Sequence, residues 1–159
     1  MTPGYGYLVE GGRSDEEAPP FRDIVRSRRQ VAEVAVRAME AQRRAAAKSL
    51  DDDAEPGERQ LAAWDADFYD GVVMTVGWAR GDRAEAPITR AQPAEVTARA
   101  LQLERVYAED VIERGSDRWT ADWLPPRWYG EGVRRAISWL LGDEAAPPVP
   151  RLMETGEPQ

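Results

Sequence analysis

One segment of the chain occurs twice, and this internal repeat limits the possible folds more than any other feature of the sequence. Residues 68–90 read FYDGVVMTVGWARGDRAEAPITR, and residues 129–151 read YGEGVRRAISWLLGDEAAPPVPR, with a constant offset of 61 positions and no gap. The identical pairs include Gly71/Gly132, Trp78/Trp139, Gly81/Gly142 and Pro87/Pro148. A repeated segment indicates a repeated unit of structure, so we expect both copies to fold alike.

Each copy has the pattern of the second half of a helix followed by an extended exit. Phe68, Val72 and Val76 are spaced four residues apart, which places them on one helical face. Gly81 follows the last apolar turn, as expected of a glycine that ends a helix in the left-handed conformation. Residues 72–76 would also suit a strand, but the helical spacing that continues from Leu61 favours a helix.

A second face of each repeat helix combines a glycine with a tryptophan. Gly71 and Trp78 are seven residues apart, as are Gly132 and Trp139, so each pair lies on one side of its helix. A glycine there lets another backbone approach closely. This face either meets another helix of the same fold or forms a groove for a partner. We favour the first interpretation, because binding grooves are few per protein.

The whole sequence predicts an all-α fold with helices over residues 20–50, 57–80, 93–115 and 126–141. Residues 1–19 are expected to form a flexible N-terminal arm, residues 20–142 a helical domain, and residues 143–159 a Pro-rich tail. Since the repeat falls on the second and fourth helices, the expected architecture is a four-helix arrangement of two helical hairpins. A pseudo-two-fold axis would relate the hairpins, and the first helix would be the longest.

The third predicted helix has two adjacent apolar stripes. One stripe includes Leu103, Tyr107 and Val111, and the other includes Leu101 and Ala108. An apolar surface of that width predicts a helix covered on two sides.

A Trp-rich connection follows the third helix, with Trp119, Trp123 and Trp128 close together. These side chains either seal the open end of the bundle as a lid or form a binding hot spot, in which Trp is enriched. We favour the lid, because aromatic side chains bury large areas in small cores.

The composition limits the possible chemistry. The chain contains no Cys and no His, which excludes disulfides, thiol nucleophiles and the commonest general base. A carboxylate–Mg²⁺ nucleotide hydrolase stays open as a second alternative, with its acidic groups at Asp65, Asp67, Asp70, Glu109, Asp110 and Glu113. Glu109 and Glu113 share a helical face, but Asp65 and Asp67 are about 200° apart on a helix. We therefore expect no cofactor and no metal, and we favour a non-enzymatic protein.

A nucleic-acid-associated protein is the first alternative. Its basic row on the first helix would consist of Arg22, Arg26, Arg29, Arg37, Arg44 and Lys48. Two observations disfavour it: the net charge is −8, and Glu33 and Glu40 interrupt the row at ion-pair spacing. The sequence shows neither a secretory signal pattern nor an apolar stretch of membrane-spanning length, so we expect a cytoplasmic protein with no membrane partner.

Three stretches resemble small uncharacterised helical proteins of actinobacteria and their phages. These stretches are WARGDRAEAPIT at residues 78–89, AEDVI at residues 108–112 and GVRRAISWLLGDEAAPP at residues 132–148. The resemblance implies no activity, and it favours an accessory protein of a phage or mobile element.

The most probable function from the sequence is therefore that of a helical interaction or adaptor protein. The candidate partner-binding residues are Trp78, Trp139, Trp119, Trp123, Trp128, Gly71, Gly132 and Met39. The partner is either another protein or a second copy. A homodimer would use the far half of the first helix, around Met39 and Ala46. There the acidic turn at residues 51–55 of one copy would lie near Arg43, Arg44 and Lys48 of the other.

Overall fold

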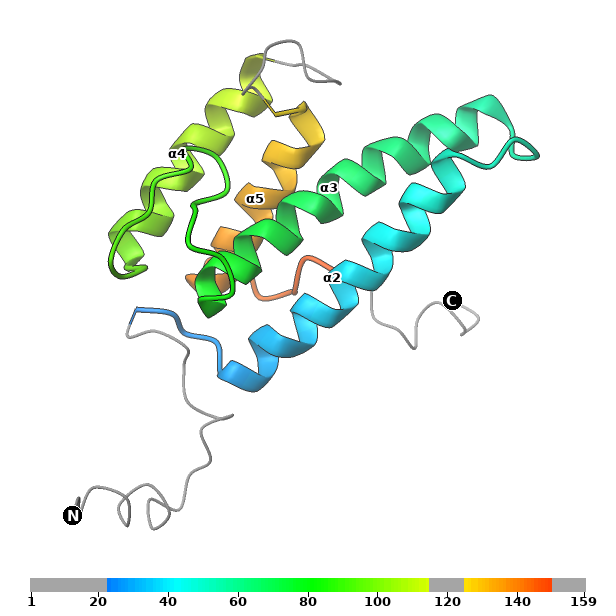
Figure 1. Cartoon of the computed structure of the whole chain (residues 1–159). Coiled ribbons are helices and arrows are strands. Elements are labelled where there is room, and N and C mark those ends of the chain that lie inside the picture. Colours follow the sequence, from blue (N-terminus) through cyan, green and yellow to red (C-terminus); the bar gives the residue numbers. More distant parts are fainter. Residues whose placement is uncertain (1–22, 115–124, 150–159) are drawn as a thin grey trace, which may run out of the picture.

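The computed structural model describes residues 23–114 and 125–149 (Figure 1). This part of the chain forms four helices: α2 (Arg28–Ser49), α3 (Pro56–Arg80), α4 (Ala98–Arg114) and α5 (Arg127–Leu140). The described residues contain no strand, so the all-α prediction is confirmed. Residues 72–76, which could also have suited a strand, lie inside α3.

The helices pack in the order α2–α3–α5–α4. A short turn over residues 50–55 folds α3 back along α2, α3 packs against α5, and α5 packs against α4. The repeat helices α3 and α5 are therefore the inner pair, and α2 and α4 lie on the outside (Figure 1). Each outer helix packs closely against one of the described helices, and part of its surface has no helical partner among residues 23–114 and 125–149.

The two inner helices cross where the repeat has its paired glycines. A Cβ added at Gly71 would lie 3.1 Å from the backbone nitrogen of Val133 and still closer to the carbonyl oxygen of Tyr129. A Cβ added at Gly132 would lie 3.2 Å from the nitrogen of Val72 and still closer to the carbonyl oxygen of Phe68. The prediction that another backbone passes near each glycine is thus confirmed, and that backbone belongs to the other copy of the repeat.

The two copies also leave their helices in the same way. Gly81 and Gly142 both adopt the left-handed conformation, with φ of 87° and 88°. The nitrogen of Asp82 donates to the Gly77 carbonyl, and the nitrogen of Asp143 donates to the Ser138 carbonyl, at 2.9 and 2.8 Å. Equivalent residues therefore make equivalent hydrogen bonds, as expected of two hairpins related by a local two-fold axis.

Both exits return to the core, and this corrects the predicted free tail. Ile88 is buried in the segment that follows Gly81. Pro148 and Val149 are buried at the equivalent place in the segment that follows Gly142. These apolar residues pack on the helices because their exposure would leave a gap in the core. Residues 143–149 are thus part of the helical domain, whereas residues 150–159 lie outside the described part, as does the predicted arm over residues 1–19.

Two helices begin later than predicted, and α2, with 22 residues, is shorter than α3, with 25, so the first helix is not the longest as predicted. Residues 23–27 are not helical, and α2 starts after Ser27, whose hydroxyl accepts from the nitrogen of Gln30 at 3.1 Å. The Gln30 side chain accepts from the nitrogen of Ser27 at 2.9 Å, which completes a capping box. This local cap, and not the proline at position 20, sets the helix start.

The third helix begins at Ala98 and not at Pro93, because polar side chains satisfy its first nitrogens. The carboxylate of Asp23 accepts from the nitrogen of Ala98 at 3.0 Å, and the Thr97 hydroxyl accepts from the nitrogen of Ala100 at 3.1 Å. The Asp23 contact also fixes the segment before α2 to the start of α4.

Candidate functional site

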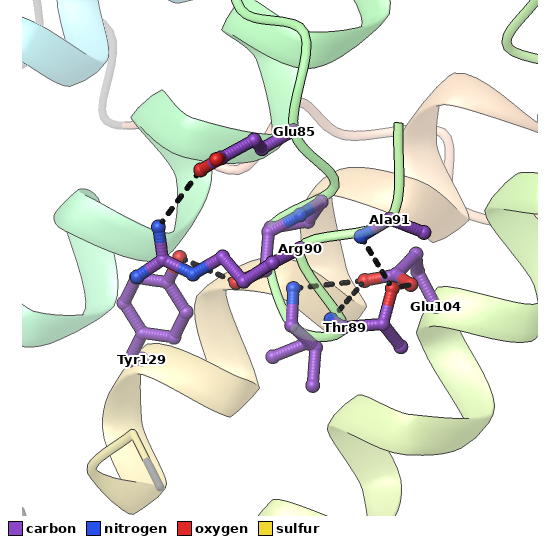
Figure 2. Close-up of polar contacts among 8 residues, drawn as sticks. Glu85, Thr89, Arg90, Ala91, Glu104 and Tyr129 are labelled. Carbon is purple, nitrogen blue, oxygen red and sulfur yellow. Dashed lines mark hydrogen bonds and ion pairs between the residues drawn. The ribbon is translucent and has the colours of Figure 1, made fainter. Parts of the chain in front are cut away.

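A buried carboxylate organises the exit loop of the first repeat. Glu104 on α4 is 3% exposed, and its side chain accepts from the nitrogens of Ile88 and Thr89 at 2.8 and 3.1 Å (Figure 2). The same carboxylate accepts from the Thr89 hydroxyl at 2.5 Å. Three donors from the loop therefore converge on one side chain, which offsets the penalty of burying its charge.

Tyr129 holds the other side of this loop. Its hydroxyl donates to the Pro87 carbonyl at 2.9 Å, so α5 and α4 both contact the exit of α3 (Figure 2). Burial raises the pKa of the Tyr129 hydroxyl above its usual range, which keeps the donor protonated. Arg90, next in the loop, has a φ of 65° and an ion pair with Glu85 at 3.3 Å. The arrangement fastens two hairpins together through a loop, which is a structural role.

The acidic groups proposed for metal chemistry lie at the surface. Asp65 and Asp70 on α3 are exposed, and so are Glu109, Asp110 and Glu113 on α4. Asp110 pairs with Arg114 at 3.1 Å. Partial desolvation raises the pKa of Asp70, while nearby Arg83 and Arg90 oppose that change. Within residues 23–114 and 125–149, no group of three or more acidic side chains is placed to hold a metal ion.

The first member of the proposed basic row that the structure describes faces inward. Arg26 donates to the carbonyls of Trp139 and Glu144 at 2.7 and 2.6 Å. Its guanidinium also lies 5.0 Å from the centre of the Trp139 ring. Arg26 therefore attaches the segment before α2 to the end of α5, and this engagement removes it from the proposed nucleic-acid surface.

The rest of the basic row is interrupted by acid, as the spacing predicts. Glu40 contacts Arg44 at 2.9 Å and Arg43 at 2.6 Å, and the hydrogen bond from Arg43 lowers the pKa of Glu40. Arg29 and Lys48 are exposed and Arg37 is half-buried, and Arg22 lies outside the described residues. The row is a mixed-charge surface of the kind that stabilises a helix.

Four of the predicted partner-binding residues belong to the interior, which corrects their assignment. Trp78 and Trp139 are almost fully buried in the core. Gly71 and Gly132 are buried where α3 crosses α5. The face that carries Gly71 and Trp78, or Gly132 and Trp139, thus contacts other parts of the same fold, which is the interpretation that we favoured from the sequence.

The Trp-rich connection is described only at its end. Trp119 and Trp123 lie outside the described residues. Trp128 is half-buried on the first turn of α5, with its ring centre 5.9 Å from that of Trp64 on α3. Trp128 thus joins the two inner helices by an aromatic contact, and Arg127 lies over the same ring at 5.4 Å.

An apolar face of α2 is open to solvent. Val36 is 64% exposed, Met39 is 58% exposed and Leu50 is 81% exposed. Val36 and Met39 share one side of the helix, about a quarter to almost half of a turn away from buried Val31 and Ala38, and Leu50 continues this side at the C-cap. We name this face the α2 stripe; along the helix it consists of Ala32, Val36, Met39, Arg43, Ala46 and Leu50.

Sequence reasoning found only part of the α2 stripe. It placed Met39 at a partner contact, whereas the structure shows in full an inner face of α2 that packs on α3 and an outer face, with exposed Val36, that has no neighbour among the described residues. The signal that could have found the stripe is the strict alternation of three- and four-residue steps from Ala32 to Leu50.

A similar open face occurs on α4, and residues 23–114 and 125–149 do not cover this helix on two sides as predicted. Leu101, Ala108 and Val111 face α5 and are buried. Leu103, Val106 and Tyr107 are exposed on a neighbouring side of the helix, roughly a third of a turn away. The exposed apolar side chains of α4 thus have no helix over them in the described structure.

Comparison of the chain with protein-family models, with curated proteins and with solved structures finds no match. In the part of the chain that the structure describes, none of the helices combines the length and the apolar character needed to cross a membrane.

Proposed function

We propose that this protein is a non-enzymatic helical interaction or adaptor protein, and that the α2 stripe is its binding surface. The observation that carries the proposal is the exposure of Val36, Met39 and the C-cap residue Leu50 along an outer helix that, among the described helices, packs closely only against α3. A single exposed apolar residue is ordinary, but a row of them along one helix is typical of an interaction site. The resemblance to phage and actinobacterial proteins supports an accessory role.

The architecture supports such a role because the rest of the helix is firmly held. The inner face of α2 packs on α3 through Val31, Val34 and Ala38, and the capping box fixes its start. The stripe is therefore a feature of a formed helix, ready to pack against an apolar surface of a partner.

The energetics indicate a partner that supplies its own apolar residues. Burying one Val, Leu or Met side chain contributes about 1.5–3 kcal/mol when the change in exposure is complete. The three exposed residues are 58–81% exposed, so each would contribute somewhat less. Association itself costs about 4–15 kcal/mol. The stripe alone offers too little to overcome this cost, so the partner must present a matching apolar row.

Site-specific photocrosslinking in the cells that produce the protein tests the proposal. A photoreactive amino acid is placed at Val36 or Met39 in the stripe and, as a matched control, at Glu33, which is exposed on the charged side of the same helix. We expect a discrete adduct from both stripe positions and none from Glu33. The absence of an adduct from both stripe positions, or the same adducts from Glu33, would contradict the proposal.

A further inference from the structure

The α2 stripe has the spacing of a coiled-coil seam. Its positions fall into two alternating sets that are seven residues apart within each set. One set, extended to the start of the helix, contains Arg29, Val36, Arg43 and Leu50, and the other contains Ala32, Met39 and Ala46. The side chains of the first set are thus all large, whereas the second set has a small alanine at each end.

This distribution of large and small residues fits an antiparallel copy of the same helix. In antiparallel packing, each position of the large set faces a position of the small set of the partner helix. Leu50 then meets Ala32 of the copy and Val36 meets Ala46 of the copy, so that these two large residues fill the space beside alanines, while Arg43 meets Met39 of the copy. In a parallel pair, Arg29 and Arg43 would each face the same residue of the copy, which opposes association.

Charge supports the same register. When Val36 is aligned with Ala46 of the copy, Arg28 and Arg29 at the start of one α2 lie just beyond the end of the other, where the acidic turn over residues 50–55 of the copy follows. Both arginines and the turn residues Asp51, Asp52 and Asp53 are exposed. Opposite charges therefore meet at both ends of the pair, in addition to the contacts that the arginines make within their own chain.

We infer that the occupant of the α2 stripe is a second copy of this chain, with the two α2 helices antiparallel and Val36 facing Ala46 of the copy. The inference rests on the proposed function. In this register, the acidic turn of the copy lies near the start of α2. The sequence had instead predicted that it lies beside Arg43, Arg44 and Lys48. The reason is that the large and small residues of the stripe set the register, with Val36 beside Ala46 and Leu50 beside Ala32 of the copy. A self-complementary patch of this kind is the usual basis of two-fold dimers.

Engineered cysteines test the register without interference, because the chain has no cysteine of its own. In the inferred register, position 36 contacts position 46 of the copy. Two copies of position 36 are offset by ten residues, or about 15 Å along the helix. Two copies of position 46 are equally far apart. These separations exceed the reach of a disulfide, whereas a facing pair is within it.

The experiment compares brief oxidation of the Val36→Cys variant, of the Ala46→Cys variant and of their equimolar mixture. A mixture of Val36→Cys with Val106→Cys is the control, because Val106 is exposed on α4, away from the stripe. We expect the first mixture to form a covalent dimer roughly tenfold faster or more than either variant alone, since groups held in contact react at a high effective concentration. Equal rates in all samples, or fastest dimerisation of Val36→Cys alone, would overturn the inference.

The photocrosslinking experiment separates the failure of this inference from the failure of the proposed function. An adduct from Met39 with the mass of two copies supports both. An adduct with a different protein overturns the second copy as occupant and leaves the interaction function in place. If no adduct forms, both are overturned.

Discussion

Replacing Gly71 by alanine tests the crossing of the two repeat helices. The added Cβ would lie 3.1 Å from the Val133 nitrogen and closer to the Tyr129 carbonyl oxygen, inside normal contact distance. Both atoms belong to the backbone of the other repeat copy, at and near the start of α5, so neither can rotate away as a side-chain end could. The helices must therefore separate, which weakens packing along their whole contact.

The expected net effect is a loss of about 2 kcal/mol in the free energy of unfolding. Overpacking of a core costs about 1–3 kcal/mol, and a clash with backbone belongs at the upper end. Alanine inside a helix is more favourable than glycine by about 1 kcal/mol, which offsets part of the loss. For a chain of this size, 2 kcal/mol corresponds to a decrease in Tm of about 4–8 °C.

Gly77→Ala is the matched control, because Gly77 lies in the same helix and a Cβ there would meet only the flexible Arg83 side chain, at 3.3 Å. We expect this variant to be as stable as the parent or more stable, from helix propensity. The assay is urea unfolding followed by circular dichroism at constant protein concentration. If Gly71→Ala is as stable as Gly77→Ala, the close crossing at Gly71 does not exist.

Gly132→Ala should repeat the loss, since its Cβ meets the other helix in the same way. The double variant should lose less than the sum of the two single variants, because helices already separated by one methyl group accommodate the second. Simple additivity would show that the two glycines lie at independent contacts.

Three further variants test the polar contacts that fix the helices. Glu104→Ala should lower the free energy of unfolding by about 2–3 kcal/mol, because it removes the acceptor of three loop donors, whereas exposed Glu109→Ala on the same helix should change it by less than about 0.5 kcal/mol in urea unfolding. Tyr129 should contribute to the free energy of unfolding below about pH 10, and this contribution should be lost as the pH rises further, because burial raises the pKa of its hydroxyl and only the unfolded chain then ionises. In urea unfolding from neutral to alkaline pH, the free energy of unfolding should therefore decline less steeply for Tyr129→Phe than for the parent. Equal slopes for the two proteins would contradict this expectation. Ser27→Ala should cost about 1 kcal/mol and increase amide hydrogen exchange in the first turn of α2, and unchanged exchange there would show that the capping box does not set the helix start.

The repeat allowed the inner half of the fold to be predicted from sequence. The four-residue spacing of Val72 and Val76 predicted α3, and the paired glycines predicted a close backbone approach. Both predictions could succeed because helical periodicity and the small size of glycine act locally, whatever the rest of the fold does. What the sequence could not say is that each glycine faces the other copy, since that depends on how two distant segments meet.

Helix starts and the candidate site were harder to predict, for a physical reason. The start of α2 depends on the cap that Ser27 forms with Gln30, which competes with the favourable proline further upstream. The start of α4 depends on Asp23, far away in the sequence. Likewise, periodicity gives the width of an apolar surface but not which part of it a neighbour covers. Leu103 was therefore expected to be covered, and the structure leaves it exposed.

The most direct test of the central claim is the mass of the protein in solution. Sedimentation equilibrium of the parent chain is compared with that of the variant Met39→Glu, Ala46→Glu, which places two charges in the α2 stripe. We expect the parent to reach twice its chain mass of 17.8 kDa within the range of tens of micromolar, where weak interfaces associate. The variant should stay at 17.8 kDa and keep the same helix content. A parent that remains a monomer over this range, or a variant that associates equally well, would contradict the claim that a second copy covers α2.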